Sequence, residues 1–187
     1  MAKYTLKGSL SQKGIESLIK QVDIYQHRIL PAKCELLIKS LLQKGINVVR
    51  ATISQGLGDA PKSYSTPTKY TFDVSIGKYV GSFFLTSAPQ VDEEGRVFYP
   101  HLAWEFGAGI EYNNGTSHPQ AAEFGLGVGT FPDQRHAINP GYWYYRDGLG
   151  QLHLSLGTKA EMPMYKASIE IIRVIESTAR EVFGNGE

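Results

Sequence analysis

The chain has 187 residues, of which 42% are hydrophobic, which is enough apolar material for the core of one domain. A formal net charge of +1 gives no electrostatic drive toward DNA or an anionic membrane. One cysteine, Cys34, excludes an intrachain disulfide and a multi-cysteine zinc site, and no apolar run approaches the ~20 residues that span a bilayer. Because the N-terminal stretch lacks an apolar segment, we expect no secretory signal and a protein made in a reducing cytosol.

The first third of the chain predicts helix. Ser9 or Ser11 can cap a helix start, after which apolar residues recur at the i, i+3, i+4, i+7 spacing at Ile15, Leu18, Ile19 and Val22. Pro31 interrupts this pattern, and a second apolar run predicts a longer helix from about residue 32 to about residue 53, weakened at Gly45. Either two helices meet at a short break at Leu30, or one long helix is kinked at Pro31.

The middle of the chain predicts strands after a loop at residues 55–69. Apolar and polar residues alternate from Tyr70 to Ile76, which is typical of a half-buried strand. A two-residue turn at Gly77-Lys78, with glycine at positive φ, would return the chain into a partner strand over residues 80–86. Residues 97–99 begin a third strand, and the proline that follows favours a short helical turn through residues 101–105.

The last part predicts a hairpin and a helix. Residues 142–146 and 151–156 flank a glycine-bearing turn, and Pro163 opens an amphipathic helix that stops after Phe183. Its predicted apolar face comprises Met164, Ile171, Val174, Ile175, Thr178 and Val182. The sum is a single α+β domain over residues 1–187, in which two N-terminal helices and a C-terminal helix pack on an antiparallel sheet.

Residues 107–146 predict a long ordered loop that is rich in glycine and aromatic residues. Nine of the 20 glycines lie between Gly107 and Gly150, without helical periodicity. Aromatic residues are enriched where proteins contact each other, and few basic residues accompany them here, so a protein contact surface is favoured over nucleic acid. The predicted interface residues are Trp104, Glu105, Phe106, Phe124, Tyr142, Trp143, Tyr144 and Tyr145.

Three chemical alternatives remain open beside this contact surface. His118 and His136 share the loop with three carboxylates, Glu111, Glu123 and Asp133, and together could bind a metal in a hydrolase that acts on cell wall. Glu105 and Glu111 could form a carboxylate pair for glycoside chemistry, although nothing in the sequence fixes their separation. The aromatic run at residues 142–145 could bind sugar as a carbohydrate-binding module. The glycines at residues 125–129 lack the strand and helix that a nucleotide-binding loop requires.

The order of short motifs between Leu102 and Ala167 resembles tailed-phage head–tail joining proteins, the neck or tail-completion proteins of siphophages. Residues 102–109 read LAWEFGAG, similar to the family's Glu-Phe-Gly-Thr-Gly signature, with Ala108 where threonine is common. Residues 122–132 resemble the family's repeated Glu-Phe-Gly, followed by Gly-x-Gly-Thr and Pro. Then come a Trp-Tyr pair and the segment 157–167, which is similar to the start of the family's last helix.

This resemblance implies a virion structural protein, located in the neck or tail and in the host cytoplasm during assembly. It implies an α+β fold and a homo-oligomeric ring between the head connector and the tail tube. The expected partners are the connector or adaptor, the tail tube and the tail terminator, without specific nucleic acid or membrane. The family carries no catalytic residues, so we expect no enzyme activity, no cofactor and no metal.

Overall fold

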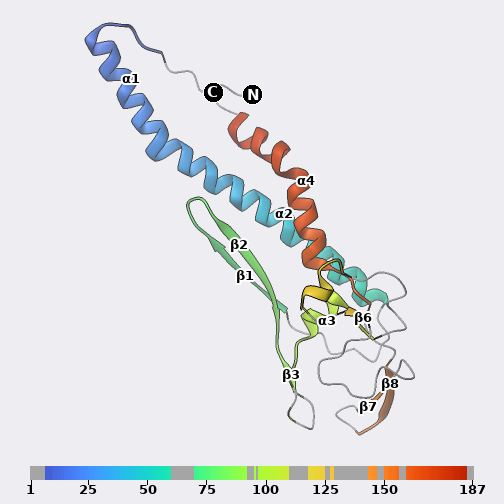
Figure 1. Ribbon diagram of the computed structural model, residues 1–187. Helices are drawn as coiled ribbons and strands as arrows, with labels where there is room; N and C mark the ends of the chain where they lie inside the picture. Colours follow the sequence, from blue (N-terminus) through green and yellow to red (C-terminus); the bar gives the residue numbers. More distant parts are fainter. Residues whose placement is uncertain are drawn as a thin grey trace. The chain divides into compact units, whose positions relative to one another are not determined.

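A computed structural model gives the fold of the chain (Figure 1). It describes residues 7–59, 70–91, 95, 97–109, 118–124, 127–128, 143–146, 150–155 and 159–184. The elements in chain order are α1 Gln12–Ile24, the π-helix η1 Tyr25–Ile29, α2 Leu30–Asp59, β1 Tyr70–Ile76, β2 Gly81–Ser87, β3 Gln90–Val91, β4 Val97–Phe98, α3 Pro100–Phe106, β5 Ala108–Gly109, the 3-10 helix η4 Ala121–Phe124, β6 Gly127–Val128, β7 Trp143–Arg146, β8 Leu152–Ser155 and α4 Pro163–Gly184.

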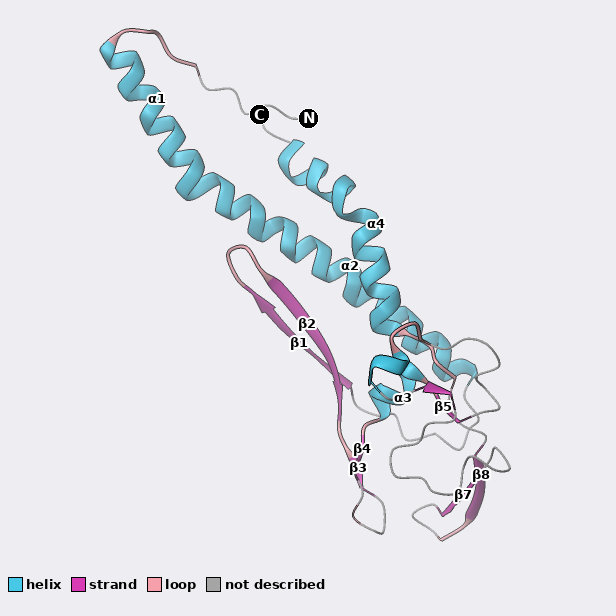
Figure 2. Cartoon of the chain, viewed as in Figure 1, coloured by secondary structure: helices cyan, strands magenta, loops and turns pink. Residues whose placement is uncertain are grey.

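The fold class is α+β, as the sequence predicts, but the strands do not form one sheet. The described strands form four two-stranded sheets, β1–β2, β3–β4, β5–β6 and β7–β8 (Figure 2). The β5–β6 pair is parallel, whereas β3–β4 and β7–β8 are antiparallel. In the described residues the predicted strands are therefore divided among separate two-stranded sheets. Strands of only two residues, such as β3 to β6, expose too few backbone groups to extend a sheet.

The N-terminal helices are one continuous rod, because α1, η1 and α2 follow each other without a break. Ser11 caps α1, since its side-chain oxygen accepts a hydrogen bond from the Gly14 N–H. The N–H of Leu30 donates to the carbonyl of Tyr25, five residues back, which is the wider π spacing. Pro31 has no N–H and its ring collides with the carbonyl four residues back in an ordinary helix. The wide turn therefore precedes the residue that an α-helix tolerates least.

The β1–β2 pair is a hairpin whose first strand has the bounds that the alternation predicts. The N–H of Gly77 donates to the carbonyl of Val80 at 2.7 Å, so the central turn residues are Lys78 and Tyr79 rather than Gly77 and Lys78. Gly77 does not have a positive φ, which corrects that part of the prediction. The second predicted hairpin is confirmed, because Trp143 pairs with Ser155 and Arg146 pairs with Leu152.

The chain divides into two compact units. The first comprises Met1–Ile46, Val74–Phe83 and Ser168–Glu187, and the second comprises Asn47–Asp73 and Phe84–Ala167. The prediction of a single domain over residues 1–187 stays a prediction. No helix in the described ranges is both long enough and apolar enough to cross a membrane.

In the first unit, two glycines let neighbouring elements approach α2. Gly45 lies inside α2, and the helix continues through it to Asp59. A Cβ at Gly45 would lie 2.8 Å from the Ile171 side chain and 3.0 Å from the Phe83 ring, so glycine is what allows both to pack there. Gly81 of the hairpin approaches Ile38 in the same way.

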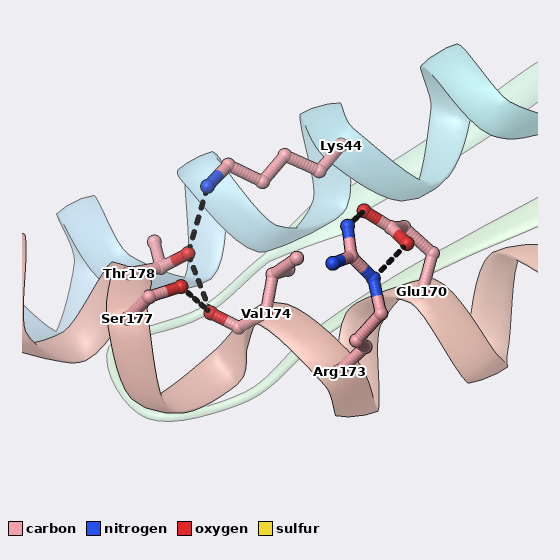
Figure 3. A network of polar contacts seen from close by, with 6 residues as sticks. All are labelled: Lys44, Glu170, Arg173, Val174, Ser177 and Thr178. Carbon is pink, nitrogen blue, oxygen red and sulfur yellow. Dashed lines mark hydrogen bonds and ion pairs between the residues drawn. The ribbon is translucent and has the colours of Figure 1, made fainter.

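A polar contact accompanies this packing of α4 on α2 (Figure 3). The Lys44 ammonium donates to the Thr178 hydroxyl oxygen at 2.9 Å, and the Thr178 hydroxyl donates to the Val174 carbonyl at 2.8 Å. Thr178 is fully buried, and these two contacts satisfy its hydroxyl. On the exposed side of the same helix, the Arg173 guanidinium binds Glu170 through two hydrogen bonds and lowers the pKa of that carboxyl.

In the second unit, the buried residues come from the end of α2, from β2, from the end of α3, from residues 118–121 and from the segment around the start of α4. Val49 and Ala167 are fully buried. The other buried residues of this unit are Thr52, Ile53, Leu85, Glu105, Gly107, His118, Ala121, Ala160 and Pro163. Glu105 and His118 are the two members of this set that can ionise, and they mark the candidate site.

Candidate functional site: the Glu105 cluster

The first turn of α4 has no capping side chain of its own. Pro163 occupies the first helical position, where its fixed φ suits a helix and its missing N–H costs nothing. Met162 precedes it and cannot accept a hydrogen bond in the way that serine, threonine or aspartate does at this position. The N–H groups of Met164 and Tyr165 therefore need an acceptor from elsewhere in the chain.

Glu105 supplies that acceptor from the last turn of α3. Its Oε2 accepts from the Met164 N–H at 2.7 Å, and its Oε1 accepts from the Tyr165 N–H at 2.8 Å. A carboxylate is favoured at a helix N-terminus because the free N–H groups and the helix dipole both present positive charge. Glu105 is only 8% exposed, so these bonds replace the water that it loses on folding.

His118 is the third partner of this carboxylate, and it is 4% exposed. Its Nδ1 accepts a hydrogen bond from the Gln120 N–H at 3.0 Å, so the proton of the neutral ring resides on Nε2. The Nε2–H lies 3.1 Å from Oε1 of Glu105 and donates to it. The ring packs against Phe106 and Tyr165, with centroid separations of 4.6 Å and 5.1 Å. Both ring nitrogens of His118 are thus occupied within the chain.

The backbone of Trp104 ties the segment before α4 to the same place. Its carbonyl accepts from the N–H groups of Glu161 at 2.8 Å and of Met162 at 3.1 Å. Met162 has a φ of 54°, a left-handed conformation that a side chain disfavours by ~1 kcal/mol or more. The surrounding hydrogen bonds hold it there, and its carbonyl accepts the first helical bond, from Lys166.

Each residue of the Glu-Phe-Gly signature therefore has a structural task. Glu105 caps α4, Phe106 packs on His118, and Gly107 ends α3 with a φ of 76°, which glycine adopts without strain. The second Glu-Phe-Gly differs, because Glu123 lies in η4 with an exposed side chain. The two copies of the motif are not equivalent in the structure.

The predicted interface residues fall into three groups. Trp104, Glu105 and Phe106 are consecutive residues of α3. Glu105 is buried, whereas Trp104 and Phe106 are half-buried. Trp143, Tyr144 and Tyr145 form β7, and Phe124 ends η4. Tyr142 lies outside the described residues. That these residues bind another protein stays a prediction.

Only some residues of the predicted metal site and of the predicted carboxylate pair lie among the described residues. His136, Glu111 and Asp133 lie outside them, so the predicted metal set and the Glu105–Glu111 pair cannot be assembled from the structure. Within the described ranges, no group of three histidine, cysteine or acidic side chains is placed to hold a metal ion. His118, the described histidine of that set, is engaged with Glu105 and Gln120 instead.

The contacts that link Glu105 with His118 and with the start of α4 are not predicted by the sequence. One local signal is present, because Pro163 opens the helix without serine, threonine, aspartate or asparagine before it, which leaves the first N–H groups without a local cap. Comparisons with family models, with curated proteins and with solved structures find no match for this chain. The resemblance to head–tail joining proteins therefore stays a prediction.

A second histidine, His101, lies near the start of α3. Its backbone N–H donates to the Ser87 hydroxyl oxygen at 3.3 Å, and its ring Nδ1 lies 2.8 Å from the same oxygen. The Ser87 hydroxyl therefore caps α3 through the backbone N–H and also shares a hydrogen bond with the imidazole, which fixes the orientation of the ring. Partial burial lowers the pKa of His101 below its ordinary value of 6.5.

This shift predicts a loss of stability in mild acid. Because the pKa is lower in the folded state, the unfolded chain binds a proton at higher pH than the folded chain does. Neutral His101 makes its full contribution to the free energy of unfolding above pH 6.5. This contribution falls as the pH drops from 6.5 toward the pKa of His101 in the folded state. In His101→Phe, urea unfolding measured from pH 7.5 to 5 should show a smaller decline in unfolding free energy than in the parent. Equal declines would contradict the assignment.

Proposed function

We propose that this chain is a virion structural protein of the neck or tail-completion type, which joins the head connector to the tail tube of a tailed phage. The proposal starts from the order of motifs between Leu102 and Ala167, which resembles that of head–tail joining proteins. Its work would be binding rather than bond chemistry. The expected partners are the connector or adaptor, the tail tube and the tail terminator, with copies of the chain arranged as a ring.

The observation that carries the proposal is that Glu105 and His118 use their polar atoms in hydrogen bonds within the chain. Both oxygens of Glu105 accept backbone N–H groups, and both nitrogens of His118 make hydrogen bonds inside the chain. A general acid or a metal ligand needs a lone pair or proton directed at a substrate or an ion. Glu105 and His118 instead hold the start of α4 in place, which suits a protein whose function is its shape.

The surface of the described elements supports an assembly role. Large apolar side chains are exposed along α1, at the β1–β2 turn and along α4, including Ile19, Val80 and Ile172. Single exposed apolar residues are ordinary, but rows of them on regular elements are typical of surfaces that bind other proteins. No described arrangement favours the hydrolase or the carbohydrate-binding module in the same way.

Disrupting the gene in the phage or prophage that encodes this chain tests the proposal. We expect lysates that contain filled heads and separate tails, with plaque formation lost, because the joining step would be absent. Electron microscopy of negatively stained lysates measures this directly. Supplying the parent chain from a plasmid should restore joined particles. Normal virions in the absence of the gene would contradict the proposed function.

A further inference from the structure

The β1–β2 hairpin presents its first strand as an exposed edge. Within the described residues, β1 pairs with β2 and with no other strand. It has seven residues without a proline, and Asp73 is its one charged residue. Residues 73–76 are all exposed, whereas β2 lies against α2, where Gly81 approaches Ile38. A long exposed edge strand that carries little charge is a template for pairing with another strand.

The turn of the hairpin fixes which backbone groups of β1 point away from β2. The N–H of Gly77 donates to the Val80 carbonyl, so these two residues face each other as a hydrogen-bonded pair. In an antiparallel ladder, such residues alternate with residues whose N–H and C=O groups point away from the partner strand. Counting back from Gly77, the residues of the second kind are Ile76, Val74 and Phe72. Their backbone donors and acceptors lie along the outer edge of β1.

The same edge carries apolar side chains that are only partly covered. Val74 and Ile76 lie two residues apart and so share one face of the strand. This is the face that the hairpin turns toward α2, because their cross-strand neighbours are Phe83 and Gly81 and both approach that helix. Val74 is nevertheless 46% exposed and Ile76 is 39% exposed. A further strand beside β1 would cover both side chains and pair the outward backbone groups.

The strand that fits this edge best is a second copy of β1. In an antiparallel pair centred on Val74, the outward groups of both copies meet, and Ile76 lies opposite Phe72 of the second copy. Asp73 then lies opposite Ser75, an uncharged residue. A pair centred on Asp73 would instead place two carboxylates directly opposite each other, which is destabilising. A pair centred on Phe72 would carry Ile76 past the start of the second strand, so the register centred on Val74 is favoured.

We propose that two copies of this chain pair edge to edge through β1, antiparallel and centred on Val74, and form one four-stranded sheet in the order β2–β1–β1–β2. The contact is two-fold, because the same strand serves both copies, and it therefore stops at a dimer. A sheet of more than two strands with one apolar face is also more stable than a lone hairpin. The inference goes beyond the proposed function: the contacts of a ring are head-to-tail, whereas this contact is two-fold and does not depend on the phage role.

The mass of the full chain in solution tests the dimer, by light scattering and sedimentation over a range of concentrations. We expect the parent to form a dimer. Val74→Lys and Val74→Glu should each weaken it by about tenfold or more, because two like charges would meet at the centre of the contact. Phe84→Lys is the matched control and should dimerise like the parent, since Phe84 is 59% exposed and lies on the other face of the same hairpin.

Mixing variants tests the register. Val74→Lys mixed with Val74→Glu should give a 1:1 dimer, because the two-fold axis sets position 74 of one copy against position 74 of the other and the charges become opposite. Val74→Pro should also abolish the dimer, because it removes an outward N–H and leaves the hydrogen bonds between β1 and β2 in place. Circular dichroism confirms that each variant keeps its fold.

Three results would each overturn the inference: a parent that stays monomeric at hundreds of micromolar, a Val74→Lys variant that dimerises like the parent, or a mixture of the two charge variants without a dimer. A Phe84→Lys variant that loses the dimer would place the contact on the other face of the hairpin and would overturn it as well.

Discussion

Replacing Glu105 with alanine is expected to lower the free energy of unfolding by about 3–5 kcal/mol, which is the typical cost of removing one member of a buried charged network. The change leaves three donors without their acceptor, the N–H groups of Met164 and Tyr165 and the Nε2–H of His118. Each unsatisfied buried donor costs about 1–3 kcal/mol, and part of this is regained where water enters. Urea unfolding followed by circular dichroism measures the loss.

The chain offers a matched control in its second Glu-Phe-Gly motif. Glu123 is exposed, so Glu123→Ala should change stability by no more than about 0.5 kcal/mol. The loss of unfolding free energy in Glu105→Gln should fall between those of Glu105→Ala and Glu123→Ala. The amide keeps one acceptor oxygen but turns an NH₂ group toward another donor. A Glu105→Ala variant that loses less than about 1 kcal/mol would show that the cap does not stabilise the fold.

Gly81→Ala is expected to cost about 1–3 kcal/mol, the usual penalty for overpacking a well-filled site. The new Cβ would lie 2.2 Å from Cγ2 of Ile38 and 2.9 Å from Cδ1 of Leu42. Isoleucine on a helix is held in one χ1 rotamer, so its methyl group cannot turn aside without strain. The hairpin must therefore move away from α2, and Phe83 would lose part of its packing around Gly45.

Gly77→Ala in the same hairpin is the control. A Cβ there meets only the Val80 carbonyl oxygen, at 3.3 Å, and Gly77 has no positive φ. We expect a change within about 1 kcal/mol in either direction, because alanine also reduces the freedom of the unfolded chain. Thermal unfolding of the parent and both variants measures whether Gly81→Ala loses more stability than Gly77→Ala. Equal losses at positions 77 and 81 would contradict the close approach of β2 to α2.

The elements that the sequence predicts well are those whose signal is local. The alternation from Tyr70 to Ile76 predicts the whole of β1, and the apolar spacing after Pro163 predicts the start of α4. Ser11 as a cap depends on residues three apart, so its role is also visible in the sequence. Gly45 is the exception, since packing against Ile171 and Phe83 outweighs its poor helix propensity.

The arrangement of the site depends on contacts between residues far apart in the chain. Glu105 meets Met164 after 59 residues and Tyr165 after 60 residues, and no periodicity relates them. The sequence suggested His118 as a metal ligand because it shares the glycine-rich loop with His136 and three carboxylates. In the fold, a backbone N–H and a carboxylate occupy both nitrogens. The division of the strands among separate sheets also could not be predicted, because alternation defines strands and not their neighbours.

The π turn at residues 25–29 has a consequence for the direction in which α1 presents its side chains. A π turn holds about one residue more than an α turn, and each helical residue advances by about 100° around the axis. Removing a single residue from this turn, for example His27, would swing the stripe of Ile15 and Ile19 around the rod by a quarter turn or more while leaving α2 untouched. The wide turn thereby determines the direction, around the helix axis, in which α1 presents its apolar side chains.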